Sequence, residues 1–315
     1  MDFVGLGIQA VLLIVGFILL IKGSDFFVDG ASNIASILRI PALIVGLTIV
    51  AFGTSAPEAA VSITSSLTGS NALAVSNVIG SNLFNILLII GICALLKELE
   101  LDKKVLKTDL PFLLIITIIA SAFILYGWDI SRIEGIILLI FIIGYVAYLV
   151  INTRKSKQSQ DVEKPKISLL RSIIYIIGGI AGIVIGANFV VDSASYIAMA
   201  FGMSETLVGL TIVAMGTSLP ELVTSLTALR KGETELIIGN VIGSNIFNIL
   251  FVLGASSAIS PIIVNSNMLM DIILMIIVTL LCFIFAKTQD KYDKKEGFIL
   301  VALFILYMAF AILRN

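Results

Sequence analysis

Long apolar runs alternate with short polar segments along the whole 315-residue chain. A run of about 20 apolar residues is long enough to cross a bilayer as an α-helix. The pattern predicts ten transmembrane helices, and the fold class is an all-α polytopic membrane protein. The expected spans are 5–36, 41–68, 72–96, 107–127, 132–151, 169–200, 205–229, 235–259, 267–286 and 296–313.

One stretch of this pattern occurs twice. Residues 46–91 read GLTIVAFGTSAPEAAVSITSSLTGSNALAVSNVIGSNLFNILLIIG, and residues 209–254 read GLTIVAMGTSLPELVTSLTALRKGETELIIGNVIGSNIFNILFVLG. The copies align without a gap at an offset of 163, with 26 identities over 46 positions. Upstream, GSDFFVDGAS aligns with GANFVVDSAS at the same offset. We therefore expect a first five-helix repeat at 1–151, a linker at 152–168 and a second five-helix repeat at 169–315.

The distribution of Lys and Arg predicts the orientation. With the N-terminus outside, 17 of the 20 basic residues fall in cytoplasmic loops, which is the asymmetry expected of membrane proteins. Five spans precede the sixth, so the second repeat enters the membrane from the opposite side and the two repeats are inverted. We expect a multi-pass protein of the plasma membrane, with both termini outside and the polar linker RKSKQSQDVEKPK in the cytoplasm.

Composition excludes several classes of function. The chain is 59% hydrophobic, and its 13% of charged residues is about half the share in a soluble domain. It has no histidine, which removes HExxH zinc chemistry and Ser/His or Cys/His nucleophile pairs. Cys93 and Cys282 lie in apolar runs and are expected to be buried hydrophobes. A net charge of −1 gives no indication of a nucleic-acid partner, and no enzymatic activity is predicted.

Each copy of the repeat places one glutamate directly after a proline inside an apolar run, as Glu58 and Glu221. An ionisable residue at membrane depth is expensive and is functional by default. Proline lacks an N–H, so Pro57 and Pro220 are expected to free carbonyl groups one turn earlier in their helices. Such backbone groups must line a site when they lie within a bilayer. Nearby hydroxyls come from Thr54, Ser55, Thr217 and Ser218.

A polar stripe follows each glutamate helix. Asn77, Ser81 and Asn85 are spaced by four residues, and the second copy has Asn240, Ser244 and Asn248. Small and amide side chains also serve helix packing. That role and a site role are equally open for Asn77 and Asn240, whereas we favour the site for Ser81, Asn85, Ser244 and Asn248.

Two carboxylates among hydroxyls, amides and carbonyls form the ligand set of a hard cation. Ca²⁺ accepts about 6–8 oxygen ligands in flexible geometry, whereas Mg²⁺ sheds its water reluctantly. The absence of soft ligands argues against zinc and copper. Na⁺ also prefers oxygen, and two carboxylates are neutralised by one Ca²⁺ or by two monovalent cations. Competition for the same oxygen atoms is sufficient for antiport.

The paired GTSxPE and NVIGSNxFN motifs resemble the α-repeats of the sodium/calcium exchanger family, in its compact prokaryotic form. The resemblance implies a Na⁺/Ca²⁺ antiporter with alternating access, in which spans one and six slide against a fixed core. It implies no cofactor, Ca²⁺ and Na⁺ as transported ions, a lipid bilayer as surroundings and no obligate protein partner. It also implies Glu58 and Glu221 as central ligands, together with Thr54, Ser55, Thr217, Ser218, the carbonyls of Ala51 and Ala214, and Ser81, Asn85, Ser244 and Asn248.

One position departs from part of the family. Potassium-dependent exchangers and some prokaryotic relatives have Asp where this chain has Asn248. Asn keeps an oxygen ligand but removes a titratable charge, which argues against a potassium requirement and a proton-linked role there. A H⁺- or K⁺-linked Ca²⁺ antiporter is the alternative, a cation channel is a more distant one, and the Na⁺ to Ca²⁺ stoichiometry stays open.

Overall fold

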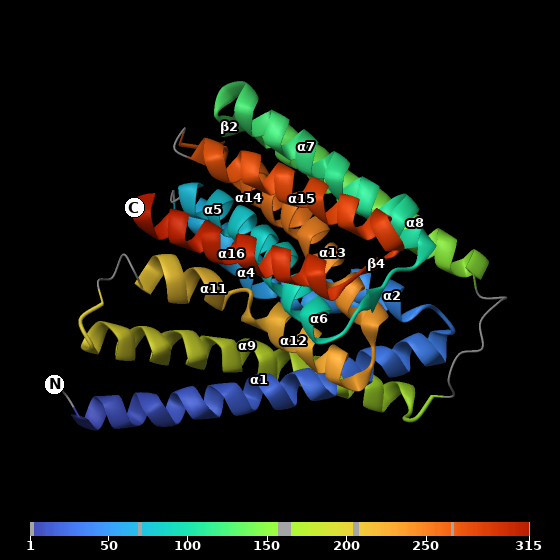
Figure 1. Ribbon diagram of the computed structural model, residues 1–315, viewed down its shortest axis with the longest axis horizontal. Coiled ribbons are helices and arrows are strands. Elements are labelled where there is room, and N and C mark those ends of the chain that lie inside the picture. The colour runs from blue at the N-terminus through green and yellow to red at the C-terminus, as the bar shows by residue number, and fades with distance from the viewer. Residues whose placement is uncertain (1–2, 69–70, 157–164, 204–207, 266–267, 315) are drawn as a thin grey trace.

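The structure is a computed structural model that describes residues 3–68, 71–156, 165–203, 208–265 and 268–314, and it is almost entirely helical (Figure 1). The first half contains α1 (Phe3–Leu38), α2 (Ala42–Val45), α3 (Ala51–Thr54), α4 (Ala56–Leu67), α5 (Asn71–Leu83), α6 (Gly91–Leu96), α7 (Leu110–Gly127) and α8 (Arg132–Ser156). The second half contains α9 (Leu169–Ala200), α11 (Ala214–Gly216), α12 (Leu219–Lys231), α13 (Thr234–Phe247), α14 (Gly254–Ile259), α15 (Leu269–Gln289) and α16 (Lys294–Arg314).

Among the described residues, eight helices are long and apolar enough to cross a membrane. A ninth candidate is the pair Ala42–Thr54 and Ala56–Leu67, which bends by 48° at its break. The prediction of a helical polytopic membrane protein is therefore confirmed. The seventh predicted span, 205–229, begins outside the described residues, and its described part consists of α11, α12 and the helical turn that precedes them.

In the described ranges, five segments have π-helical hydrogen bonding, which the apolar pattern did not predict. They are η1 (Gly46–Val50), η2 (Phe84–Ile90), η3 (Val105–Asp109), η4 (Gly209–Val213) and η5 (Asn248–Leu253). At the offset of 163, η1 matches η4 and η2 largely matches η5. Single π-turns inside α-helices are frequent at functional sites because they displace the side chains that follow them.

The two longest helices, α1 and α9, lie side by side along one edge of the molecule (Figure 1). Glycines make this contact close: a Cβ added to Gly23 would lie 2.9 Å from the carbonyl oxygen of Gly179, and one added to Gly179 would lie 2.8 Å from that of Gly23. Small residues at a membrane helix interface allow such close backbone approach.

The remaining helices form a core around α5 and α13, whose residues are largely buried. Two small antiparallel sheets connect loops of the two halves. Strand β1 (Leu99–Glu100) pairs with β4 (Lys291–Tyr292), and β2 (Asp129–Ile130) pairs with β3 (Ile262–Ile263). Each half is therefore joined to the other at both ends of the core.

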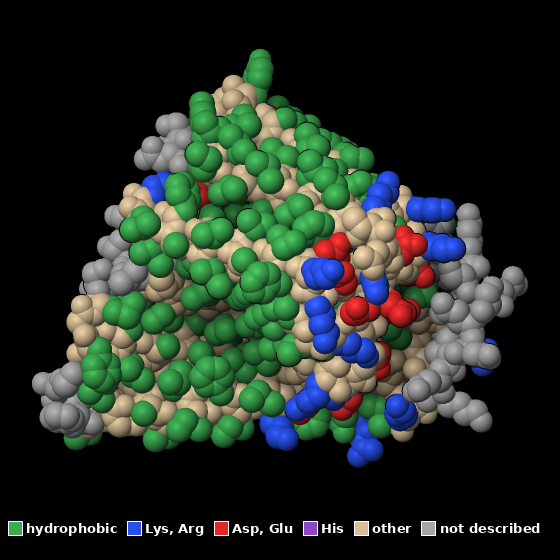
Figure 2. Space-filling model, in the orientation of Figure 1, with side chains coloured by type: hydrophobic (Ala, Val, Ile, Leu, Met, Phe, Trp, Pro, Cys, Tyr) green, Lys and Arg blue, Asp and Glu red, His purple; other side chains and the backbone are tan. Residues whose placement is uncertain are grey.

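Charged side chains gather at one end of the face drawn in Figure 2, whereas hydrophobic side chains cover most of the rest. Many of the exposed hydrophobic residues belong to α1, α8 and α16, as expected of surfaces that face lipid. Both chain ends lie toward the opposite end from the charges (Figures 1 and 2).

Candidate functional site

The two glutamates lie in the first turn of a helix that follows a break. In the first half α3 ends at Thr54, Ser55 leaves helical geometry with φ −84° and ψ 9°, and α4 then begins. In the second half Ser218 has nearly the same angles, φ −92° and ψ 5°. The prolines fall in these first turns, where the missing N–H costs no helical hydrogen bond. The breaks thus place Glu58 and Glu221 at helix N-termini, where the helix dipole favours negative charge.

Both glutamates are fully buried, and each is bonded by a serine from the break of the other half. Ser218 Oγ donates to Glu58 Oε1 at 3.1 Å, and Ser55 Oγ donates to Glu221 Oε1 at 2.8 Å. Ser81 Oγ is 3.4 Å from Glu58 Oε1. The two broken helices therefore meet at the centre of the molecule.

Two asparagines brace the glutamate helices in the same way. Asn77 Nδ2 donates to the carbonyl oxygen of Glu58 at 3.2 Å, and Asn240 Nδ2 donates to that of Glu221 at 3.4 Å. Their amide groups also bind Ser62 and Ser225, each at 3.0 Å. The amide oxygens accept from the other half: Asn240 Oδ1 from Thr54 Oγ1 at 3.0 Å, and Asn77 Oδ1 from Thr217 Oγ1 at 3.3 Å. These asparagines connect the two halves as well as packing within each.

A second pair of asparagines was not singled out from the sequence. Asn245 Oδ1 accepts from Asn85 Nδ2 at 2.9 Å, and Asn82 Oδ1 accepts from Asn248 Nδ2 at 3.3 Å. Asn82 and Asn245 are related by the offset of 163, and that repetition at a buried polar position was the available signal. Asn82 and Asn245 accept hydrogen bonds from the amide nitrogens of Asn248 and Asn85, and the amide oxygens of Asn85 and Asn248 take no part in these bonds.

Four buried oxygen atoms of the site lack a hydrogen-bond donor among the described residues. They are Glu58 Oε2, Asn85 Oδ1, Glu221 Oε2 and Asn248 Oδ1. The four form two pairs related by the internal repeat. Buried acceptors are almost always paired in native proteins, because an unpaired one loses its hydration without compensation.

The charge of the site is also unbalanced within the described part of the chain. Neither Glu58 nor Glu221 forms an ion pair there with Lys or Arg. The same residues contain no group of three or more Asp, Glu, Cys or His side chains placed to hold a metal ion. The candidate site thus combines two carboxylates with uncharged oxygen atoms of hydroxyl and amide groups.

Ser244 and two alanine carbonyls are further predicted ligands. Ser244 Oγ is 3.4 Å from Thr54 Oγ1. The carbonyl oxygen of Ala51 accepts the backbone N–H of Ser55 at 3.0 Å, and Ala214 is the first residue of α11. Asn85 lies in η2 and Asn248 opens η5, so π-helical turns carry both amides.

A family model for the sodium/calcium exchanger protein matches residues 8–153 and 171–313. The chain is 38% identical over 314 residues to the putative antiporter CaxA of Alkalimonas amylolytica, covering 95% of this chain and 97% of that protein. It is 31% identical over 341 residues to the sodium/calcium exchanger MaX1 of Methanosarcina acetivorans, covering 96% and 97%.

The fold is similar to solved structures of the sodium-calcium exchanger NCX_Mj, including one soaked with Na⁺ and Sr²⁺. The TM-score is 0.86 at 33% identity, and the match covers 96% of this chain and 99% of that one. These matches cover nearly the whole chain and nearly the whole length of each relative. The chain therefore belongs to the sodium/calcium exchanger family, whose members are transporters and not enzymes.

Proposed function

We propose that this protein is a Na⁺/Ca²⁺ antiporter that binds both ions at the centre formed by Glu58 and Glu221. The observation that carries the proposal is the set of four unpartnered buried oxygens, two from carboxylates and two from amides. A hard cation bonds to such oxygens and balances the charge of the two glutamates. Ca²⁺ and Na⁺ are the transported substrates.

The ligand set proposed for the two ions extends beyond these four atoms. Ca²⁺ takes about 6–8 oxygen ligands, so two glutamates need help from neighbouring hydroxyl, amide and carbonyl groups. The full proposed set is Glu58, Glu221, Thr54, Ser55, Thr217, Ser218, Ala51, Ala214, Ser81, Asn85, Ser244 and Asn248. One Ca²⁺ or two Na⁺ balance two carboxylate charges, and further Na⁺ would bind to neutral oxygens.

We further propose ten transmembrane helices in two inverted five-helix repeats, residues 1–151 and 169–315, joined by a cytoplasmic linker at 152–168. The tenth crossing is the chain from η4 through α12. An even number of crossings is supported by the two chain ends lying at the same end of the molecule (Figure 1). The gathering of Lys and Arg at the other end supports an orientation with both termini outside, and we propose that the membrane is the plasma membrane (Figure 2).

Transport then follows from exposing this centre alternately to the two sides of the membrane. Without a bound cation, the two buried carboxylates disfavour the change between the two access states, because an uncompensated charge inside the protein is costly. Ca²⁺ or Na⁺ removes that penalty, so the loaded carrier changes state and the empty one does so slowly. This preference couples the two ion fluxes.

The test is ⁴⁵Ca²⁺ uptake into proteoliposomes loaded with Na⁺, with K⁺, or with acidic buffer at equal osmolarity. We expect uptake with an outward Na⁺ gradient and none above background with the other two. Uptake driven only by a pH or K⁺ gradient would refute the sodium assignment. Ca²⁺ conductance without any counter-ion gradient would indicate a channel instead.

A further inference from the structure

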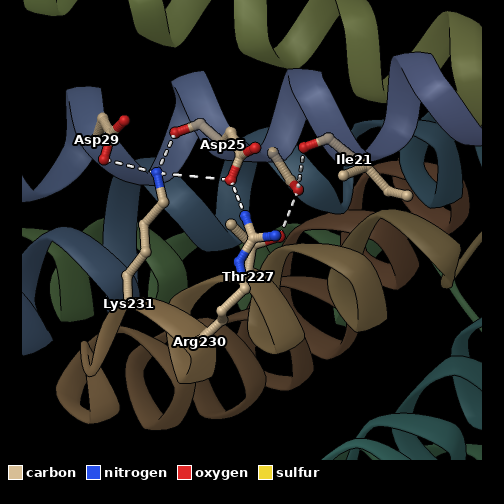
Figure 3. Close-up of polar contacts among 7 residues, drawn as sticks. Ile21, Asp25, Asp29, Thr227, Arg230 and Lys231 are labelled. Atoms are coloured by element: carbon tan, nitrogen blue, oxygen red, sulfur yellow. Dashed lines mark hydrogen bonds and ion pairs between the residues drawn. The ribbon is translucent and has the colours of Figure 1, made fainter.

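An ion-pair cluster connects α1 to the C-terminal end of α12 (Figure 3). We define it by two acids of α1, Asp25 and Asp29, and two bases of α12, Arg230 and Lys231. Arg230 pairs with the Asp25 carboxylate. Lys231 Nζ lies 2.6 Å from Asp29 Oδ1 and 3.6 Å from Asp25 Oδ1, and it donates to the carbonyl oxygen of Asp25 at 2.8 Å.

A buried hydroxyl contact adjoins the cluster on the side of the membrane interior. Ser24 Oγ is 2.7 Å from Thr227 Oγ1, and both residues are buried (Figure 3). The side chains of Asp25 and Lys231 are about three-quarters buried, with 22% and 24% exposed. The contacts therefore run from the helix interface to the aqueous surface and hold α1 against α12.

The internal repeat has no equivalent cluster at the other end of the molecule. At the offset of 163, Asp29 corresponds to Asp192 on α9, but Asp25 corresponds to Asn188. The two bases correspond to Leu67 and Thr68. No ion pair of Asp192 occurs within the described ranges, and its residue is exposed.

Helix packing has the same asymmetry. α1 packs along α12, whereas α9 makes no comparable contact with α4, the repeat-related helix. All residues of these four helices are within the described part of the chain. The molecule is thus closed between α1 and α12, and that closure is at the end where the charged residues gather (Figures 1 and 2).

We propose that the Asp25–Asp29–Arg230–Lys231 cluster is a one-sided latch, which stabilises the state closed on the α12 side and so sets the resting bias between the two access states. This proposal rests on the alternating access proposed above. In two inverted repeats the opposite state has α9 packed on α4 and α1 released from α12. Release breaks the ion pairs on one side, and no matching pairs form on the other.

The latch acts on populations and not on ion ligation, since none of its four residues touches Glu58, Glu221 or the amides around them. Partly exposed ion pairs are weakened by salt. Raising the ionic strength on the α12 side is therefore expected to weaken the latch, as removal of its charged side chains by substitution would.

The experiment measures opening of the α1–α12 interface without relying on transport. The wild-type chain has two cysteines, Cys93 and Cys282, and both are buried. A Thr227→Cys variant adds one thiol inside the closed interface, and a membrane-impermeant maleimide reports its exposure in vesicles of each orientation. Asp25→Asn/Asp29→Asn and Arg230→Gln/Lys231→Gln are compared in this background, with Asp192→Asn as the matched control.

We expect each double variant to speed labelling from the α12 side by roughly three- to tenfold, and the combined quadruple variant to do no more than either double. Asp192→Asn leaves the rate unchanged. Unchanged labelling in both double variants, or an equal rise in the control, overturns the latch. Because the assay needs no ion gradient, it separates this failure from failure of the Na⁺/Ca²⁺ assignment, which the uptake experiment reports.

Discussion

The two halves of the molecule make the same asparagine contacts at the centre but differ in how their helices pack. At the centre Asn77 and Asn240 make the same contacts to the glutamate backbone and to a serine. The helices around these contacts pack differently. A Cβ added to Gly243 on α13 would lie 2.7 Å from Ala51 Cβ, whereas one added to its counterpart Gly80 on α5 would meet no atom within 4 Å in the part of the chain that the structure describes.

This difference shows that one sequence pattern occupies two environments. Among the described residues, α13 packs tightly on η1 and α3, while α5 makes fewer contacts with η4 and α11. The α1–α12 contact and its ion pairs occur on one side as well. A repeat-symmetric sequence that is asymmetric in structure is expected of a carrier captured in one of two related states.

The largest effect is expected from Glu58→Gln and from Glu221→Gln, each tested alone. Either change removes one of two charges that balance a divalent cation, and an uncompensated ion in a buried site costs about 3–5 kcal/mol. We expect ⁴⁵Ca²⁺ exchange to fall by at least about a hundredfold in both variants.

The matched control for this pair is Glu100→Gln in β1, which is exposed and remote from the centre. It should exchange like wild type, and all three variants should elute as the native protein does. Wild-type exchange in only one of the two glutamate variants would show that the two glutamates are not equivalent.

Much of the centre was predictable because polar residues stand out in apolar helices. Glu58 and Glu221 could be identified because an ionisable side chain within a membrane carries a large free-energy cost and is usually functional. The internal repeat indicated that the two glutamates belong together. For the eight described helices long enough to cross a membrane, the predicted bounds agree to within a few residues, as with 169–200, which is α9. These features depend on local pattern and length, which sequence carries directly.

Other features depend on tertiary contacts between residues far apart in the sequence, and the pattern of apolar and polar positions does not predict those contacts. The cross-half bond from Ser55 to Glu221 requires the breaks to face each other in space. The π-helical turns arise where packing displaces one residue, with no distinct composition at η2 or η5. Asp29 pairs with Lys231, 202 residues away, and a tertiary contact of this kind is not visible in the local pattern.

An intermediate effect is expected from Gly243→Ala, with Gly80→Ala as its repeat-related counterpart. The added methyl group of Gly243→Ala would press on Ala51 and Leu47, and overpacking of this kind costs about 1–3 kcal/mol. Thermal unfolding in detergent should show a lower midpoint for Gly243→Ala and little change for Gly80→Ala.

The same pair of variants also tests the asymmetry of the two states. If α5 closes on η4 and α11 in the opposite state, Gly80→Ala disfavours that state and slows exchange without destabilising the protein. Equal destabilisation by both substitutions would mean that the looser packing of α5 does not describe the resting protein.

The smallest effect is expected from Asn82→Ala and Asn245→Ala, which remove positioning residues and leave every proposed ligand in place. Asn82 Oδ1 orients the amide of Asn248, and Asn245 Oδ1 orients that of Asn85. Loss of one such hydrogen bond is worth about 0.5–1.5 kcal/mol, so we expect the KM for Ca²⁺ to rise by about three- to tenfold with little change in maximal rate.

Asn33→Ala is the control, because Asn33 is also buried and forms hydrogen bonds to Ile167 and Ser172, but lies away from the centre. It should lower thermal stability and leave KM unchanged. A rise in KM for one of the two central variants alone would show that the halves hold their amides unequally, and the asymmetry of the molecule would then reach the ion site itself.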